Sequence, residues 1–182
     1  MCGGDGTRLA TDREKPMFPI RGTPMVERVR GALADSKIER IFAVTSPATP
    51  ETAAILDCPT IETPGEGYVA DLDRALADDR VARPVLTVAA DLPLLDGASV
   101  DAVVDAASGS LTVVVPVGRK RALGLSIDTQ FRYRGRAVTP AGINVVDDVD
   151  DEVWVRRDLG YAVNVNRRTD ARRAEWWLAG RE

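Results

Sequence analysis

The chain has 182 residues, of which 45% are hydrophobic, and its formal net charge is -4. This length and composition suit one globular domain with a substantial core, so we expect residues 1–182 to form a single domain. The negative charge argues against a nucleic-acid partner, because nucleic-acid-binding proteins usually carry a basic face. The longest apolar runs, residues 41–44 and 111–117, are far shorter than the roughly 20 residues that cross a bilayer, so no membrane span is expected.

The start of the chain has no apolar signal region, and its two cysteines, Cys2 and Cys58, are far apart in sequence. Two such cysteines suit neither a disulfide framework nor a zinc cluster. These features predict a cytoplasmic protein. We assign Cys2 to packing, because only the chain terminus lies near enough in sequence to lower the pKa of its thiol.

In chain order, short β-branched runs alternate with segments of helical spacing. The runs at residues 41–45, 85–89 and 111–115 are typical of strands buried on both faces, as in a parallel sheet. The apolar stripes with helical spacing are Met25, Val29 and Leu33; Tyr68, Leu72 and Leu76; and Val100, Val103, Val104 and Ala107. The alternation predicts an α/β fold, a three-layer α/β/α sandwich with a mostly parallel sheet.

Other segments interrupt or end this alternation. Residues 119–144, which are rich in Arg and Gly, are expected to cover one rim of the sheet. The acidic run at residues 147–152 predicts a solvated loop rather than a metal site, because like charges repel one another. A strand over residues 161–165 and a helix over residues 169–178 are expected to close the chain.

A glycine-rich loop begins at the third residue of the chain. Three glycines in four positions allow the backbone to approach a ligand closely and turn its N–H groups inward. A hydroxyl and a fixed positive charge follow directly, which indicates phosphate binding. No Gly-Lys-Ser or Gly-Lys-Thr follows, so the loop is not a Walker loop. The residues expected to bind nucleotide phosphates are Gly3, Gly4, Gly6, Thr7 and Arg8.

A second motif, Glu14-Lys15-Pro16-Met17, follows the loop. A lone lysine is usually a surface residue. Here Lys15 would place a second positive charge beside the same phosphates. The two motifs together favour a ligand site over a plain turn.

These motifs resemble the MobA-like nucleoside-triphosphate transferase family, whose sequences open with an apolar strand, a Gly-Gly-x-Gly-Thr-Arg loop and a Lys-Pro pair. Stretches at residues 43–50, 63–72, 90–94 and 140–145 are similar to the archaeal adenosylcobinamide-phosphate guanylyltransferases. The resemblance implies a Rossmann-like fold and transfer of GMP from GTP to adenosylcobinamide phosphate in cobalamin biosynthesis. It also implies Mg²⁺ as cofactor and a homodimer.

The sequence departs from that family at its start. Relatives have a strand that leads into the glycine loop, whereas here the loop begins at Gly3. We therefore expect a central strand to be missing from the sheet, which would leave a gap in the core. Our hypothesis is a start codon assigned too late, and an in-frame stop codon immediately before Met1 would contradict it.

Asp91 follows the run at residues 85–89, and open α/β sheets bind ligands at the carboxyl ends of their strands. An Asp at the end of a strand is otherwise often a helix cap. The resemblance implies that Asp91 is the magnesium carboxylate and that Arg8 and Lys15 neutralise the triphosphate. Asn166 matches a second metal-side position that is often an Asp in relatives. With an amide there, a polar contact or a structural role is an equal alternative.

Recognition of guanine requires hydrogen-bond acceptors, because the base presents donors at N1 and N2. Residues Gly65 and Glu66 lie in a stretch suited to this role. Glu66 is also suited to cap a helix that begins near Gly67. Thr45 and Ser46, at the end of their strand, are expected to line the base pocket.

Gly142 and Asn144 are candidate acceptor-binding residues in the stretch Pro-Ala-Gly-Ile-Asn. Gly142 is either a point where the backbone passes close to substrate or an ordinary turn glycine. Asn144 would orient the substrate.

Two other functions compete with guanylyl transfer to adenosylcobinamide phosphate. One is transfer to molybdopterin or another acceptor by a related nucleotidyltransferase. The other is a non-catalytic nucleotide-binding role, supported by the missing strand and by the amides of Asn164 and Asn166. The chain contains no histidine, but this does not argue against nucleotidyl transfer to either acceptor. A phosphate-monoester nucleophile is already largely a dianion at neutral pH and needs no general base.

Overall fold

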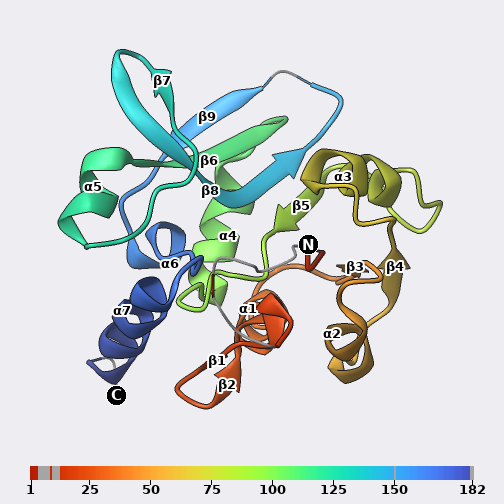
Figure 1. Ribbon diagram of the computed structural model, residues 1–182. Coiled ribbons are helices and arrows are strands. Elements are labelled where there is room, and N and C mark those ends of the chain that lie inside the picture. The colour runs from red at the N-terminus through yellow and green to blue at the C-terminus, as the bar shows by residue number, and fades with distance from the viewer. Residues whose placement is uncertain (4–8, 10–12, 150, 181–182) are drawn as a thin grey trace.

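The computed structural model describes residues 1–3, 9, 13–149 and 151–180 and confirms the α/β class (Figure 1). Gly4, Gly6, Thr7 and Arg8 lie outside the described residues. The helices are α1 Met25–Ala34, α2 Pro50–Ile55, α3 Tyr68–Leu76, α4 Gly97–Ala106, α5 Val117–Ala122, α6 Leu159–Ala162 and α7 Arg168–Ala179, with a 3-10 helix at Lys15–Met17. The strands are β1 Pro19–Ile20, β2 Thr23–Pro24, β3 Ala43–Thr45, β4 Thr60–Glu62, β5 Val85–Val88, β6 Leu111–Pro116, β7 Phe131–Tyr133, β8 Arg136–Val146 and β9 Glu152–Val155.

The larger sheet has the strand order β5-β8-β6-β9, with β7 also paired to β8. Strand β8 is antiparallel to β5, β6 and β7, and β6 is parallel to β9. Strands β5, β6, β7 and β9 therefore run in one direction, and β8 runs in the opposite direction. Strands β3 and β4 form a separate parallel pair, and β1 and β2 a short antiparallel hairpin. The strand directions agree with the expected mostly parallel sheet, although β8 makes the pairing mixed.

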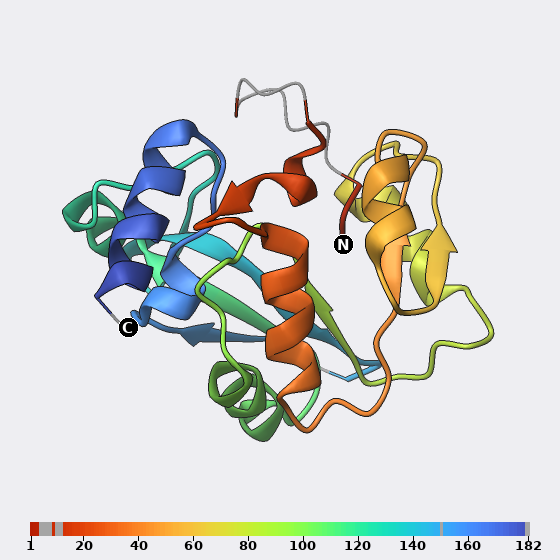
Figure 2. The same cartoon turned by 90° about the horizontal axis from the view of Figure 1, so that it is seen from below.

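Helices α1, α4 and α6 pack on one face of the larger sheet (Figure 2). The apolar stripes of α1 and α4 meet the β-branched residues of β6 and β8, as the helical spacing predicts. Helix α3 lies toward the other face, where the Tyr68 hydroxyl is 3.2 Å from Thr87 Oγ1 on β5. The core residues shared by these elements are Val29, Ala32, Val88, Val100, Val103, Leu111, Val113, Val115, Ala141, Ile143, Val145, Tyr161 and Ala162.

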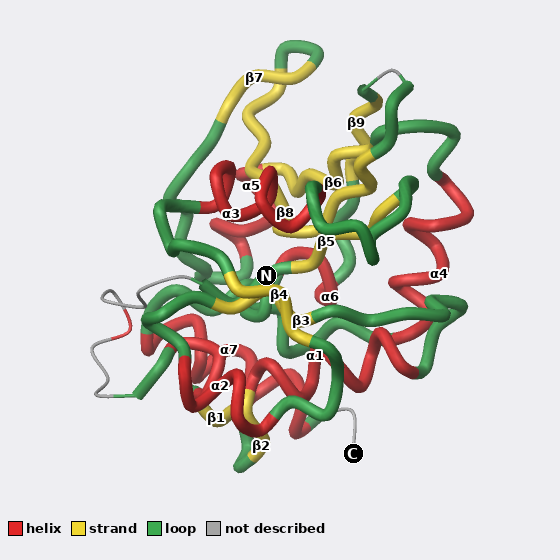
Figure 3. Tube along the Cα trace, turned by 90° about the vertical axis from the view of Figure 1, so that its right-hand side faces the viewer, coloured by secondary structure: helices red, strands yellow, loops and turns green. Residues whose placement is uncertain are grey.

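The N-terminus lies between the larger sheet and the β3–β4 pair, with β5 on one side and β3 and β4 on the other (Figure 3). The Met1 amino group donates to the Val88 carbonyl at 2.9 Å, and the Cys2 N–H donates to the Val44 carbonyl at 2.8 Å. Cys2 is buried, in agreement with its predicted packing role. No helix among the described residues is both long and apolar enough to cross a membrane.

Two expectations for the second half of the chain are wrong. Residues 119–144 do not cover a rim, because they include much of β8, which lies inside the larger sheet. Residues 161–165 are not a strand, because Tyr161 and Ala162 belong to α6, where the Ala162 N–H bonds to the Asp158 carbonyl at 3.0 Å. A short apolar run does not by itself distinguish a strand from a buried helical turn.

Gly97 begins α4 where that helix meets the end of α1, and a Cβ on Gly97 would lie 2.4 Å from the Asp35 carbonyl oxygen. We expect Gly97→Ala to destabilise the fold by about 2–3 kcal/mol, because the backbone of α1 must move. Gly31→Ala is the matched control, since a Cβ there meets nothing within 4 Å. Urea unfolding should show Gly31→Ala to be neutral or stabilising by up to ~1 kcal/mol, and equal behaviour of the two variants would contradict the prediction.

Candidate active site

A pocket of about 270 Å³ lies beyond the carboxyl ends of β4 and β5, beside the start of the glycine-rich loop. Its walls come from the segment that follows β4 and from the segment that follows β5 in the larger sheet. The pocket brings together four of the predicted residues, Gly3, Lys15, Gly65 and Asp91. Its lining residues are Met1, Cys2, Gly3, Lys15, Pro16, Gly65, Gly67, Tyr68, Asp71, Ala89, Ala90 and Asp91.

Lys15, Asp91 and Asn166 form the polar centre of this site. The Lys15 ammonium lies 2.6 Å from Asp91 Oδ2 and 2.6 Å from Asn166 Oδ1. The backbone N–H of Val165 donates to the Asp91 carbonyl at 2.9 Å, which fixes the segment of Asn166 against the end of β5. The Lys15 and Asp91 side chains are only 18% and 14% exposed, so this ion pair is partly shielded from solvent.

Glu14 fixes the backbone next to Lys15. Its carboxylate accepts hydrogen bonds from the N–H groups of Glu51 and Thr52, at 2.6 and 2.7 Å, and from the Thr52 hydroxyl at 2.5 Å. These groups belong to the first turn of α2, where free N–H groups favour an anion. With Pro16 setting φ in the short 3-10 helix, Lys15 is therefore attached to a defined backbone.

The fully buried carboxylate of Asp170 holds the segment of Asn166 from behind. It accepts hydrogen bonds from the Asn166 and Arg167 N–H groups at 3.1 and 2.9 Å. It also accepts from the Ser126 N–H at 2.8 Å and the Ser126 hydroxyl at 2.7 Å. Asp170 thus joins the start of α7 to the loop after α5 and sets the position of Asn166.

We expect Asp170→Ala to lower the free energy of unfolding by about 3–4 kcal/mol, because four donors lose the same buried acceptor together. Asp105→Ala is a matched control, since Asp105 makes an exposed ion pair with Lys37 and should cost less than about 1 kcal/mol. Denaturant unfolding of both variants tests this. A loss for Asp170→Ala no larger than that for Asp105→Ala would show that the buried carboxylate is not a structural anchor.

Lys120 is a second lysine near the site that the sequence did not single out. It is 1% exposed on α5, and its ammonium donates to Asn164 Oδ1. Burial lowers the pKa of Lys120, while the negative charges of Asp91, Asp170 and Asp128 oppose that shift. Asn164 therefore has a structural partner, and Asn166 is the amide that faces Lys15.

Gly3 and Gly65 both pack closely against Ser46, so a larger side chain at either position would crowd its surroundings. A Cβ on Gly3 would lie 3.2 Å from Asp71 Oδ2 and 3.5 Å from Ser46 Oγ, and one on Gly65 would lie 3.1 Å from the Ser46 Cβ. Gly65 also has a φ of 79°, a conformation that favours glycine. The conformation and the close contact of Gly65 thus require glycine at this junction with β3, whereas a Cβ on Gly3 would need a small shift of the Asp71 side chain.

Thr45 and Ser46 are buried behind this junction and do not line the pocket. The Thr45 carbonyl accepts from the Thr63 N–H and hydroxyl, both at 2.9 Å, so this residue links β3 to the following loop. The Ser46 hydroxyl is buried and has no hydrogen-bond partner among the residues that the structure describes.

Near Gly65, the acidic residue in the pocket lining is Asp71, not Glu66. Glu66 is exposed and outside the lining, and α3 has Gly67 as its N-cap with no side-chain cap bond, so the predicted capping by Glu66 is wrong. Asp71 is 4% exposed and accepts from the Gly65 N–H at 2.9 Å. The sequence signal that could have identified Asp71 was its position in the first turn of α3, four residues after Gly67.

Gly142 and Asn144 lie on β8 next to the pocket rather than in its lining. Gly142 has a φ of 83°, and its carbonyl accepts from the Ala89 N–H at 2.7 Å. A Cβ there would lie 3.1 Å from the Ala89 Cβ, so the structure provides a packing reason for glycine. The Asn144 amide donates to the Tyr68 hydroxyl at 3.2 Å and thereby positions a lining residue.

The oxygen atoms of Asp91 and Asn166 suit Mg²⁺, a hard cation commonly held by one or two carboxylates together with water and phosphate oxygens. Both oxygens already face one common cation, the Lys15 ammonium. Among the described residues, no group of three or more His, Cys, Asp or Glu side chains gathers as a metal cluster. The donor set therefore fits a magnesium ion shared with a bound triphosphate, not one held by protein alone.

The fold and this site define a nucleotidyltransferase. The model of the MobA-like NTP transferase domain matches residues 1–160, and the chain belongs to that family. The chain is 30% identical, over 98% of its own length and 95% of the relative, to the adenosylcobinamide-phosphate guanylyltransferase of Methanocaldococcus jannaschii. Both findings agree with the predicted resemblance.

Solved structures agree with the fold. A hypothetical transferase from Thermus thermophilus superposes with a TM-score of 0.58 and 26% identity over 79% of the chain, which spans 60% of the length of that protein. A CMP:2-keto-3-deoxy-manno-octonic acid synthetase complexed with CTP superposes with a TM-score of 0.68 and 13% identity, over 96% of this chain and 95% of the other. At that identity, the second similarity concerns the fold alone.

Proposed function

We propose that the protein transfers GMP from GTP to adenosylcobinamide phosphate, giving adenosylcobinamide-GDP and pyrophosphate. The observation that carries this proposal is the similarity to an adenosylcobinamide-phosphate guanylyltransferase along almost the whole chain, combined with a pocket that contains Gly3, Lys15 and Asp91. The proposal includes a cytoplasmic homodimer in cobalamin biosynthesis, with Mg²⁺ as cofactor and no nucleic-acid partner.

In the proposed reaction, an oxygen of the acceptor phosphate forms a bond to the α-phosphorus of GTP. The bond from that phosphorus to the oxygen bridging to the β-phosphate breaks, and the electron pair leaves with pyrophosphate. The acceptor is largely a dianion at neutral pH, since the second pKa of a phosphate monoester is about 6. No general base is required, which suits a chain without histidine.

The protein's contribution is alignment and charge neutralisation. Gly3 begins the loop whose backbone N–H groups would face the phosphates, and Lys15 would move its charge from Asp91 to the triphosphate. Arg8, which lies outside the described residues, would add a second cation. Asp91, with Asn166, would hold Mg²⁺, which supplies further neutralisation of the phosphate oxygens when bound.

For the guanine base, the buried Asp71 replaces Glu66 as the proposed acceptor. One of its oxygens accepts from the Gly65 N–H, and the other faces Gly3 at the edge of the pocket. A carboxylate can accept from both N1 and N2 of guanine, whereas adenine presents an acceptor at N1. Gly65 would shape this end of the pocket, with Ser46 and Thr45 packed behind it, and Gly142 and Asn144 would support from β8 the side that takes the acceptor.

The deciding experiment supplies GTP labelled at the α-phosphate, with Mg²⁺, and offers adenosylcobinamide phosphate or molybdopterin in separate reactions. We expect label in the corrinoid product and equimolar pyrophosphate. Label in molybdopterin instead would favour the competing molybdenum-cofactor function, which the MobA-like family match supports. GTP binding with no pyrophosphate from either acceptor would indicate a non-catalytic nucleotide-binding protein.

A further inference from the structure

A groove of about 700 Å³ lies between the tip of the β7–β8 hairpin and β9. The hairpin projects from the larger sheet near β9 (Figure 1). We call this cavity the hairpin groove. It is larger than the candidate active site, which encloses about 270 Å³. A cavity of this size is typical of a site for a small molecule, because packing defects in proteins are much smaller.

The lining of the hairpin groove combines apolar side chains with charges of both signs. Two arginines come from the hairpin, and two acidic residues come from the beginning of β9 and the residue before it. The charges balance and offer hydrogen-bond donors on one side and acceptors on the other. A neutral ligand rimmed with amides suits such a lining better than an anionic one. The residues concerned are Arg134, Arg136, Asp151, Glu152, Val153 and Val155.

The tip of the hairpin holds Arg134 in a conformation that favours other residues. Arg134 and Gly135 form a two-residue loop with φ values of 46° and 76°. Asn or Gly is usual at the first of these positions, because a positive φ crowds a longer side chain. The Arg134 guanidinium also lies 5.2 Å from the centroid of the Tyr133 ring. An arginine kept in this position beside a groove indicates a role in ligand contact rather than in folding.

The hairpin groove and the candidate active site open on the same face of the larger sheet. On β9, Trp154 packs against the core, so Val153 and Val155 point to the opposite face. Helix α3 lies toward that opposite face and contributes Tyr68 to the candidate active site. Both sites therefore lie on the face that points away from α1, α4 and α6.

Strand β8 connects the two sites. Val138 lines the hairpin groove, and Gly142, four residues later, bonds to Ala89 of the candidate active site. Four residues of a strand span about 13 Å. Between them on this face lies the exposed Pro140. A ligand whose body fills the groove can therefore extend an arm along β8 to the candidate active site.

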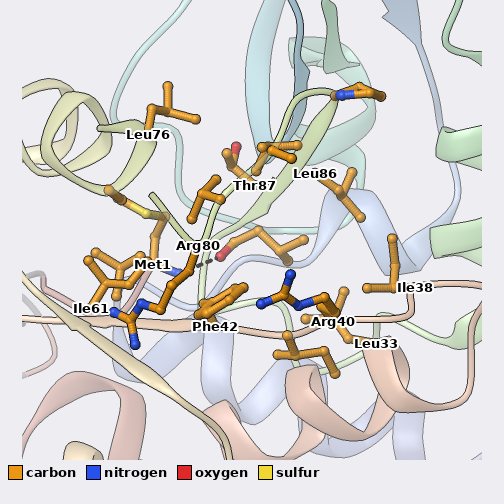
Figure 4. A pocket seen from close by; sticks show the side chains of 18 of the residues that line it. Met1, Leu33, Ile38, Arg40, Phe42, Ile61, Leu76, Arg80, Leu86 and Thr87 are labelled. Atoms are coloured by element: carbon orange, nitrogen blue, oxygen red, sulfur yellow. Dashed lines mark hydrogen bonds between the residues drawn. The ribbon is translucent and has the colours of Figure 1, made fainter. Parts of the chain in front are cut away.

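Another cavity, of about 400 Å³, lies between β5 and β3 (Figure 4). Most of its labelled side chains are apolar. The guanidinium groups of Arg40 and Arg80 lie over the Phe42 ring, at 5.3 and 5.5 Å from its centroid, so these cations already interact with an aromatic ring. This cavity is therefore a weaker candidate for a ligand rich in polar groups.

We propose that the hairpin groove holds the corrin ring of the acceptor, while the arm that carries the acceptor phosphate follows β8 to the candidate active site. The inference rests on the proposed function for the identity of the acceptor. The faces of a corrin ring are largely apolar and suit Val153 and Val155. The neutral carboxamides around the ring would accept hydrogen bonds from the arginines and donate to the carboxylates.

The first test measures binding of adenosylcobinamide phosphate without GTP, by isothermal titration calorimetry. Val155→Glu places a charge among the apolar groups of the groove, and we expect it to weaken binding at least about tenfold. Val149→Glu is the matched control, because Val149 is also exposed and lies outside the lining of the groove. In the transfer assay, Val155→Glu should raise KM for the acceptor by a similar factor and leave KM for GTP unchanged.

Arg134→Asn separates ligand contact from folding at the hairpin tip. Asn adopts a positive φ more readily than Arg, so the thermal unfolding midpoint should stay equal or rise. Acceptor binding should nevertheless weaken by about three- to tenfold, because the guanidinium donors are lost. A lower midpoint with unchanged acceptor binding would show a structural role for Arg134 and would count against the groove as the corrin site.

Equal acceptor binding by Val155→Glu and Val149→Glu would overturn the groove as the corrin site, even if the wild type transfers GMP to this acceptor. Binding by the wild type that weakens in Val155→Glu, with no transfer, would reject the proposed function and keep the groove. No binding of adenosylcobinamide phosphate to the wild type would overturn both.

Discussion

Lys15→Ala is expected to lower kcat by about 10²–10³-fold while the fold persists, because it removes a positive charge aimed at the triphosphate. Lys15 lies within 2.6 Å of both Asp91 and Asn166, at the polar centre of the pocket. No other side chain in the described lining of the pocket carries a positive charge that could replace it beside the departing pyrophosphate. Steady-state release of pyrophosphate at saturating GTP measures the effect, with circular dichroism to confirm folding.

Lys37→Ala provides the control for this measurement. Lys37 forms an exposed ion pair with Asp105 and does not line the candidate active site, so its removal should leave kcat unchanged. If Lys15→Ala turned over at the wild-type rate, Lys15 would have no place in the mechanism.

Asp91→Asn is expected to reduce kcat by a similar factor, about 10²–10³, because an amide of the same shape binds Mg²⁺ poorly and no longer balances Lys15. The substitution preserves the size of the side chain, and the Asp91 carbonyl keeps its bond from the Val165 N–H. A weakened dependence of the rate on Mg²⁺ concentration should accompany the loss. Magnesium titrations of turnover would detect both effects.

The matched control here is Asp105→Asn, which removes a carboxylate of the exposed ion pair with Lys37. A rate for Asp91→Asn within about threefold of the wild type at every Mg²⁺ concentration would exclude Asp91 as the metal carboxylate, since such a change is worth less than ~1 kcal/mol.

Much of the fold follows from local patterns in the sequence. The runs at residues 41–45 and 85–89 contain β3 and β5, and the run at 111–115 covers all of β6 except its last residue, because apolar β-branched residues suit strands buried on both faces. The stripe of Met25, Val29 and Leu33 similarly lies on α1. Strand β8 was missed because the Arg- and Gly-rich turn before it hides its alternation, in which Ile143 and Val145 face the core.

The candidate site was predictable where the chemistry is local and not where it depends on packing. Lys15 and Asp91 were found because one belongs to a short motif and the other ends a buried strand. The role of Asp170 depends on contacts between distant segments, as in the bonds it accepts from Ser126. Sequence spacing contains no signal for such contacts. Asp71 had a local signal in the first turn of α3, but the exposed Glu66 was selected instead.

The contacts of Glu14 have a consequence for where anions can bind. The amino end of a helix attracts phosphate, and α2 presents such an end close to Lys15. Its first free N–H groups are already occupied by the protein's own carboxylate, which acts as an internal competitor for external anions. In the proposed function, a triphosphate near this edge would therefore be directed away from α2 and toward Lys15, because Glu14 already occupies the competing N–H groups.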